Sequence, residues 1–463
     1  MGDSAVNAEV TSPWFDRLYP FQIDGAKVLI ARHGVLLADD MGLGKTIQAI
    51  AALRALKAGG DLESALVVAP AGLIAQWRTQ FYEWAPELVF STVRGSQTDR
   101  SWQWRTKADV YIVGYETLRS DFSTNPHSPV AKTWSVVILD EAQRIKNRDS
   151  EAAYVCKQLK RSRSWALTGT PLENRLDDTV SILEFVEDSP TRATDYVSPH
   201  DVRAALAGVQ IRRRKAEVLT ELPPKTFITV PLDLPASQRR AYDKAEREGI
   251  MELRSLGMKV TIAHVLDLII RLKQICNFCP ETGDSVKLHD LNDRLESVVS
   301  SGSRALVFSQ FVKPPFGVSH LAEELSRFEP LQYHGGMDLL EREATVARFK
   351  RDPRHAALIL SLKAGGTGLN LQEASYVFHF DRWWNPATAH QAEDRAHRMG
   401  QQQPVTVYSY VCTDTIEERI EEILREKQQL FDDVIDGALD STTGPLSAAE
   451  VFGLFGLSPP AST

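Results

Sequence analysis

Cysteine is scarce in this chain, with four residues among 463. They are too few and too scattered for a disulfide framework, which fits a reducing compartment. Cys276 and Cys279 form a CxxC pair, but a tetrahedral zinc site needs two further ligands, and no second CxxC or HxxxH pair accompanies it in the sequence. We therefore do not expect zinc there, and we interpret the pair as two half-buried thiols at a helix end.

Long apolar runs are also missing from the sequence. The longest, such as 65–70 and 136–139, fall well short of the roughly 20 residues of a membrane-spanning helix. The N-terminal residues lack a basic start followed by an apolar stretch, so a secretory signal is not expected. These absences predict a cytoplasmic or nuclear protein without a membrane partner.

Basic residues are outnumbered, 53 Lys and Arg against 61 Asp and Glu, which gives a formal net charge of −8. This balance does not exclude a nucleic-acid partner, because binding depends on the local field of a cleft. The length exceeds what one hydrophobic core usually supports, so two or three domains are expected.

Two sets of short aliphatic or β-branched runs, separated by helical patterns, predict two parallel sheets with helices on both faces. We therefore expect an α/β fold of two doubly wound lobes, with a mostly helical insertion where the strand signal fades. The first set of strands is 35–38, 65–69, 110–113, 136–139 and 165–168, and the second is 305–309, 331–334, 358–361, 377–380 and 405–410. The expected divisions are a first lobe at 1–190, the insertion at 191–281, a second lobe at 282–436 and a flexible tail at 437–463.

The tail contains a helix-start pattern. Ser447 and Glu450 have the spacing of a capping box ahead of the apolar residues of 451–455. We expect a short amphipathic helix there, either a docking peptide for another molecule or a local tether.

A glycine-containing segment after the first strand has the pattern of a phosphate-binding loop. Residues 38–46 read ADDMGLGKT and run into an apolar-periodic helix. Lys45 can reach β- and γ-phosphates, Thr46 can ligate Mg²⁺, and the glycines and the helix N-terminus favour the anion. The generic motif has a glycine where Asp39 stands, and a purely structural turn is the alternative that the strand–loop–helix context disfavours. The predicted nucleotide-binding residues of this loop are Asp40, Gly42, Leu43, Gly44, Lys45 and Thr46.

Two adjacent carboxylates follow the strand at 136–139. Asp140 and Glu141 stand where one carboxylate can join the Mg²⁺ shell and the next can act on the attacking water. Paired acids at a strand end are commonly just solvated, but the phosphate loop in the same half of the chain argues against that here. The stretch TGTP at 168–171 ends another strand and is suited to sensing the γ-phosphate. ATP and Mg²⁺ are the predicted cofactors.

The second half carries Arg395 and Arg398, whose spacing of three predicts one shared helix face. Surface arginines at this spacing are normally solvated, but an ATP site needs a guanidinium that stabilises the transition state, with an effect on the order of 10³ to 10⁵ in turnover. Gly366 lies in a glycine-rich loop at 361–370 that offers N–H groups to phosphates. Trp383 and Trp384 could stack on a nucleic-acid strand, although buried packing explains them equally well.

In order and spacing, these motifs resemble the Swi/Snf-like ATPases of helicase superfamily two over about 18–432. The matching stretches are LYPFQIDG (18–25), DDMGLGKT (39–46), VVAPAGLIAQW (67–77), DEAQRIKN (140–147), LTGTPLEN (167–174), RRRKAEVLTELPPKT (212–226), ALVFSQF (305–311), SLKAGGTGLNL (361–371), DRWWNP (381–386) and QAEDRAHRMGQ (391–401). The resemblance implies two RecA-like lobes and places 212–215 and 222–225 in the helical insertion. It also implies Gln22 as an adenine-reading residue, Gln391 at the nucleotide, Lys45, Thr46, Asp140 and Glu141 in phosphate binding and hydrolysis, and Arg395 and Arg398 as arginine fingers.

The resemblance further implies a DNA-dependent ATPase. We expect a translocase that moves on one strand of double-stranded DNA and remodels or displaces DNA-bound proteins. It would act as a monomer with a protein partner or target, in the cytoplasm on the nucleoid or in a eukaryotic nucleus. A strand-separating DNA or RNA helicase is the second interpretation, although no wedge hairpin is recognisable in the sequence. An ATP-gated assembly subunit that binds nucleic acid is the third, and the intact set of catalytic residues argues against it.

Overall fold

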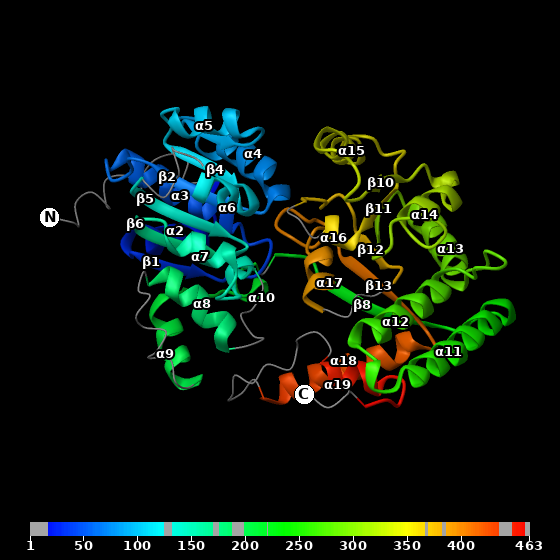
Figure 1. Cartoon of the computed structure of the whole chain (residues 1–463). Helices are drawn as coiled ribbons and strands as arrows, with labels where there is room; N and C mark the ends of the chain where they lie inside the picture. The colour runs from blue at the N-terminus through cyan, green and yellow to red at the C-terminus, as the bar shows by residue number, and fades with distance from the viewer. Residues whose placement is uncertain are drawn as a thin grey trace. The chain divides into compact units, whose positions relative to one another are not determined.

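The computed structural model describes residues 17–124, 132–169, 176–187, 199–219, 221–365, 369–381, 386–434 and 447–458. The chain divides into two compact units, Met1–Thr220 and Glu221–Thr463. Each unit is built on a parallel β-sheet with helices around it (Figure 1). The predicted α/β class with two parallel-sheet lobes is therefore confirmed.

The sheet of the first unit has seven strands in the order β3-β4-β2-β5-β6-β1-β7, and every neighbouring pair is parallel. All five strands predicted in this half are present, and the two edge strands β3 and β7 were not predicted. The strands are β1 (Gly34–Leu37), β2 (Ala65–Ala69), β3 (Phe90–Val93), β4 (Val110–Gly114), β5 (Trp134–Asp140), β6 (Arg161–Leu167) and β7 (Gln210–Ile211).

Helices cover both faces of this sheet because successive strand side chains point to opposite sides. Val67 and its alternate neighbours pack against α2 (Pro20–Ala31), α3 (Lys45–Ala58) and α4 (Ile74–Trp84). Val68 faces the other core, which includes α5 (Gln97–Arg105), α6 (Tyr115–Thr124), α7 (Glu151–Lys157) and α8 (Leu176–Val186). The remaining helices of the unit are α9 (Pro199–Val209) and α10 (Lys215–Val218).

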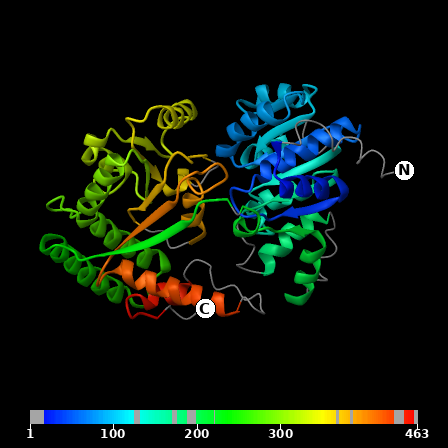
Figure 2. The same cartoon turned by 180° about the vertical axis from the view of Figure 1, so that it is seen from behind.

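The sheet of the second unit has six strands in the order β10-β11-β9-β12-β13-β8, again all parallel. The five predicted strands are present, and the long edge strand β8 was not predicted. Figure 2 shows β8 in green beside β13 in orange. The strands are β8 (Lys225–Leu232), β9 (Ala305–Ser309), β10 (Leu331–Tyr333), β11 (Ala357–Ser361), β12 (Tyr376–His379) and β13 (Val405–Cys412).

The helices of the second unit form the two covering layers of its sheet and a separate helical core. One layer contains α13 (Val286–Ser300) and α14 (Val318–Glu324), and the other contains α15 (Leu339–Arg351), α16 (Leu362–Gly365) and α17 (Pro386–Glu393). The separate core joins α11 (Ala236–Leu256), α12 (Ile262–Asn277), α18 (Ile416–Val434) and α19 (Ala448–Gly453). Short 3₁₀ turns lie at Ala71–Leu73, Ala142–Ile145, Gly257–Lys259 and Ser326–Phe328.

The range 191–281, expected as one helical insertion, is divided between the two units. The helix α9, the strand β7 and α10 lie in the first unit, whereas β8, α11 and α12 lie in the second. The β-branched and aromatic residues of β8, read KTFITV from Lys225, have the composition of a strand. Their position inside a charged, helix-rich stretch concealed this signal.

The described part of the tail contains the helix α19, which packs against the second unit. Its Ser447–Glu450 capping box is present, and Phe452 and Phe455 are buried in the helical core of the second unit. A guanidinium nitrogen of Arg419 donates to the Leu454 carbonyl at 3.1 Å. Of the two alternatives, the structure shows the local tether. Within the described ranges, the helices are too short or too polar to cross a membrane.

Candidate nucleotide-binding site

Three strands of the first unit end at the same edge of the sheet. The strand β6 lies between β1 and β5, and all three run parallel. The loop 38–44 follows β1, Asp140 ends β5, and Thr168 follows β6. Ligands of open α/β sheets bind at the carboxyl ends of strands, so the fold brings the predicted loop, acidic pair and TG turn together.

The loop after β1 turns through two glycines with left-handed backbone. Gly42 has a φ of 83° and Gly44 a φ of 74°, a region that glycine adopts without steric cost. Gly44 is the N-cap of α3, so Lys45 and Thr46 form the first turn of that helix. The positive end of the helix dipole therefore points at the loop, which gives the expected anion-binding geometry.

Lys45 is held against the backbone of the loop. Its Nζ donates to the carbonyl oxygens of Asp39 at 2.5 Å and Asp40 at 3.2 Å. Burial lowers the pKa of Lys45, and the carboxylates of Glu141, Asp39, Asp140 and Asp40 oppose that shift. An ammonium group enclosed in this way is a strong donor for a phosphate oxygen that replaces the carbonyls.

Gly169, at the end of β6, approaches the loop so closely that a side chain would not fit. A Cβ atom there would lie 2.5 Å from Met41 Cγ and 3.0 Å from Lys45 Nζ. Any larger residue would have to displace Met41, so glycine permits the close contact between this turn and the loop. Thr170 and Pro171 of the predicted TGTP turn lie outside the described residues.

Asp140 is a buried carboxyl group, 8% exposed, with its oxygens fixed by two donors. Trp77 Nε1 donates to Oδ2 at 2.7 Å, and the Glu141 N–H donates to Oδ1 at 3.0 Å. Burial, helped by the Glu141 charge, raises the pKa of Asp140 to about 7, although the Trp77 hydrogen bond and Lys45 oppose the shift. Mg²⁺ prefers oxygen ligands and favours the ionised form of a carboxyl group, so the Asp140 carboxyl group fits a magnesium ion. Thr46 lies in the first turn of α3, and its role as a second ligand stays a prediction.

Glu141 lies at the turn after β5, with a left-handed φ of 52°. Such a conformation is uncommon for a residue other than glycine and occurs often at functional sites. Its carboxylate accepts a hydrogen bond from Gln143 Nε2, and Gln143 Oε1 accepts one from the Thr168 hydroxyl at 2.9 Å. The chain of contacts connects the end of β6 with Glu141.

Gln22 is buried at the start of α2, 2% exposed. Its Nε2 donates to the Leu43 carbonyl at 3.2 Å, and its Oε1 accepts from the Tyr19 N–H at 3.1 Å. The structure therefore places this side chain against the phosphate loop. Its contact with adenine stays a prediction.

The arginine segment of the second unit is not a continuous helix, so the expectation of one shared helix face is wrong. The helix α17 carries Gln391 but ends at Glu393. Arg395 and Arg398 lie in the turns beyond it, because the Gln401 amide hydrogen-bonds three carbonyls and holds the chain in that shape.

Contacts with residues 369–371 fix the two arginines. The Arg395 carbonyl accepts from the Leu371 N–H at 3.0 Å, and Arg398 Nη1 donates to the Leu369 carbonyl at 3.4 Å. Burial and the charge of Arg395 lower the pKa of Arg398 to about 10. Their role as fingers stays a prediction. Gly366, Trp383 and Trp384 lie outside the described residues.

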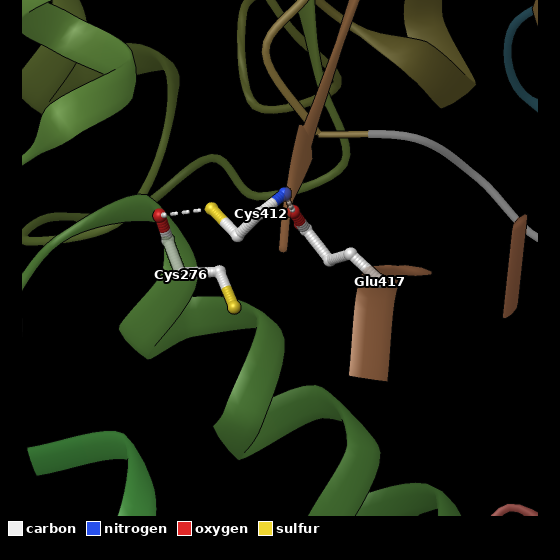
Figure 3. A group of neighbouring side chains, drawn as sticks. All are labelled: Cys276, Cys412 and Glu417. Carbon is white, nitrogen blue, oxygen red and sulfur yellow. Dashed lines mark hydrogen bonds between the residues drawn. The ribbon is translucent and has the colours of Figure 1, made fainter. Parts of the chain in front are cut away.

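Cys276, Cys412 and Glu417 form a buried cluster in the second unit (Figure 3), with candidate ligand atoms within 4.8 Å of one another. Cys412 Sγ donates to the Cys276 carbonyl at 3.7 Å. A side-chain hydrogen bond with Cys276, together with burial, raises the pKa of Cys412 well above its usual value. Lys287 Nζ lies 2.6 Å from a Glu417 oxygen. This ammonium group would repel a metal cation bound to Glu417. The cluster therefore fits a neutral thiol beside a Lys287–Glu417 ion pair.

The two thiols of the CxxC pair are more buried than the sequence suggested. Cys276 is 0% and Cys279 2% exposed, because α12 packs into the helical core with α11 and α18. The expectation of half-buried thiols is therefore wrong. The approach of Cys412 to Cys276 depends on tertiary packing, and no local pattern signals it.

Sequence reasoning missed two residues that fix the acidic pair. Trp77 holds Asp140 and Gln143 holds Glu141. Both lie inside stretches that carry the family resemblance, VVAPAGLIAQW and DEAQRIKN. Their side chains were not assigned roles because only the fold shows which atoms they reach.

Comparison with known proteins gives matches along most of the chain. The SNF2-related domain matches residues 21–280, and the helicase conserved C-terminal domain matches residues 287–400. The chain is 34% identical to the putative ATP-dependent helicase/translocase YwqA of Bacillus subtilis, over 95% of this chain and 51% of that protein. It is 31% identical to the human SWI/SNF-related matrix-associated actin-dependent regulator of chromatin subfamily A member 1, over 94% of this chain and 45% of that protein.

The chain spans about half the length of these curated relatives. Among solved structures, the Sulfolobus solfataricus SWI2/SNF2 ATPase core in complex with dsDNA is 29% identical, with 95% of this chain and 97% of that chain covered and a TM-score of 0.43.

Proposed function

We propose, because the chain belongs to the SNF2-related family, that it is a DNA-dependent ATPase that moves along double-stranded DNA. The observation that carries the ATPase proposal is the meeting of Lys45, Asp140 and Glu141 at one sheet edge of the first unit. Phosphate binding, metal binding and water activation require these three groups in one place.

Each residue has a defined task in the proposed hydrolysis. Lys45 exchanges the carbonyls of Asp39 and Asp40 for phosphate oxygens of ATP. Asp140 and Thr46 would hold Mg²⁺, which when bound would neutralise charge on the phosphates. Glu141 orients the attacking water and accepts its proton, while Gln143 holds the glutamate in place.

We propose roles for residues of the second unit as well. Arg395 and Arg398 would stabilise charge on the transferred phosphoryl group, Gln391 and Gly366 would contribute to nucleotide binding, and Gln22 would read adenine. Closure on ATP and reopening after hydrolysis would alternate the grip on one DNA strand.

Duplex DNA is the proposed track because named relatives include a putative helicase/translocase and a regulator of chromatin. Movement along one strand of the duplex would displace or remodel DNA-bound proteins. We propose a monomeric motor that acts with a protein partner or on a DNA-bound target, associated with the nucleoid or, in a eukaryote, with the nucleus. A strand-separating helicase is the second candidate, since the names of some relatives include the words ATP-dependent helicase.

The experiment is steady-state ATP hydrolysis without polymer and with duplex DNA, single-stranded DNA or RNA. Glu141→Gln serves as the blank, and its turnover should fall by about 10² to 10⁴. Strong stimulation by duplex alone supports the translocase, and displacement of a third strand from a triplex then tests movement. Stimulation by single strands or RNA alone would favour the helicase, and normal hydrolysis by Lys45→Ala would refute the assignment of the loop.

A further inference from the structure

Asp39 stands where the generic phosphate loop has a glycine, and its carboxylate is fully buried at 0% exposure. Arg213 binds it as a fork: Nε donates to Oδ1 at 3.0 Å and Nη2 to Oδ2 at 2.7 Å. The Arg213 N–H adds a third bond to Oδ1 at 3.1 Å. A paired, two-pronged contact of this kind fixes geometry as well as charge.

Neighbouring residues enclose this ion pair. Gln48 Nε2 donates to Asp39 Oδ2 at 3.0 Å, and Gln48 Oε1 accepts from Arg213 Nη2 at 2.8 Å. Arg213 Nη1 also donates to the Phe21 carbonyl. A Cβ at Gly25 would lie 1.8 Å from Gln48 Oε1 and 2.7 Å from Arg213 Nη2, so α2 can close over the pair only with glycine there.

The backbone around Arg213 is attached to the same loop. The strand β7 pairs with β1, and the Asp40 N–H donates to the Arg213 carbonyl at 3.0 Å. The Lys215 N–H donates to Asp40 Oδ2 at 3.0 Å. Residues 210–219, called the connector here, therefore run along the phosphate loop and lead to the boundary of the second unit after Thr220.

Asp39 and Asp40 thus contact Lys45 through their backbone and the connector through their side chains. Their carbonyl oxygens hold Lys45 Nζ, and their carboxylates hold Arg213 and the Lys215 N–H. When a phosphate oxygen replaces the two carbonyl oxygens as the acceptor for Lys45, the carbonyls of Asp39 and Asp40 lose this contact. The side chains of the same two residues bind the connector.

We propose that Arg213 is a positioning residue that couples the nucleotide state of the phosphate loop to the connector. Asp39 is its receptor in the loop, and Gln48 keeps the two charges aligned. The inference rests on the proposed function, since it needs a nucleotide in the loop. Through this ion pair, a nucleotide bound in the loop would change the conformation or mobility of the connector.

The experiment is amide hydrogen exchange of the full chain with and without Mg²⁺-ADP, followed in the loop at 39–46 and in the connector. In the unaltered chain, the nucleotide should change exchange rates in both segments by about fivefold or more, the low end of typical coupling between sites. In Arg213→Gln the loop should still respond while the connector does not. Arg214→Gln, at an exposed position of the same basic run, is the matched control and should respond in both segments.

A conservative pair of variants keeps the test open if Arg213→Gln does not fold. Arg213→Lys retains the charge but loses the fork, so its connector response should be smaller than that of Arg214→Lys. A loop response without a connector response in the unaltered chain would overturn the coupling and leave ATP binding standing. A full connector response in Arg213→Gln or Arg213→Lys would also overturn it, as expected if the pair only stabilises the unit. A nucleotide that protects neither segment would overturn the proposed function as well.

Discussion

Asp140→Asn should stabilise the metal-free and nucleotide-free protein at pH 8 while it abolishes hydrolysis. The Asp140 carboxyl group is buried, and burial raises its pKa to about 7 from the usual 3.8 of an aspartate. At pH 8 the folded state must therefore carry an ionised group that burial disfavours. Asparagine has nearly the same shape without the charge, so the folded state gains stability and loses the carboxylate that we propose as a ligand of Mg²⁺.

The size of the gain follows from the two pKa values. The shift from 3.8 to about 7 corresponds to at most about 4 kcal/mol, at roughly 1.36 kcal/mol per pKa unit. Asparagine keeps one acceptor oxygen and cannot satisfy both Trp77 Nε1 and the Glu141 N–H, which costs about 1 kcal/mol. We expect a net increase of about 1 to 3 kcal/mol in the free energy of unfolding.

The gain should depend on pH in a defined direction. Because the folded pKa lies above the unfolded one, the penalty is absent below pH 3.8, grows as pH rises and is complete above about pH 7. Urea unfolding with a chelator at pH 5 and pH 8 measures it, and Asp61→Asn, at an exposed position, controls for the loss of one formal charge. Equal gains at the two pH values, or a loss of stability at pH 8, would refute the reasoning.

Three further changes test other parts of the structure. Gly169→Ala should raise the KM for ATP and lower turnover, because its Cβ would lie 2.5 Å from Met41 Cγ; unchanged kinetics would mean that the turn moves freely. Arg398→Ala should keep nucleotide affinity and lose turnover on the order of 10³ or more, whereas equal loss of both would argue against a finger. Phe452→Ala should lower the free energy of unfolding by about 3 kcal/mol, because Phe452 is buried in the helical core of the second unit; urea titration measures this, and an unchanged midpoint would contradict the tether.

The sequence was sufficient for features that repeat locally or stand next to each other. Ten strands were predicted because each is a short apolar run, and the phosphate loop was predicted because its residues from Asp40 to Thr46 are consecutive. Three of the four edge strands were not predicted, because most residues of β3 and β7 are only partly buried and β8 lies in a charged stretch. The prediction of a helix that continues to Arg398 was wrong. The helix α17 ends at Glu393, and Gln401, from beyond the arginines, hydrogen-bonds carbonyls of the turns and of residues 372–374.

Contacts between distant segments could not be predicted in the same way. Trp77 reaches Asp140 across 63 residues of sequence, and Cys412 reaches Cys276 across 136. Pattern reasoning assigns a role to a residue type at a spacing, but these roles belong to pairs of atoms that only the packed sheet edge or helical core brings together.

Asp39 shows how a departure from a motif can itself carry information. As a pattern, aspartate in place of glycine weakens the match to a phosphate loop. A carboxylate placed after a buried strand is costly unless a charge partner reaches it, so the substitution implies a basic residue from elsewhere in the chain. The structure supplies Arg213, 174 residues away, from a basic run that the sequence placed in a separate insertion. Asp39, which departs from the phosphate-loop motif, and Arg213, which belongs to the basic run at 212–215, therefore form one ion pair. The loop tolerates aspartate because the connector supplies the opposite charge.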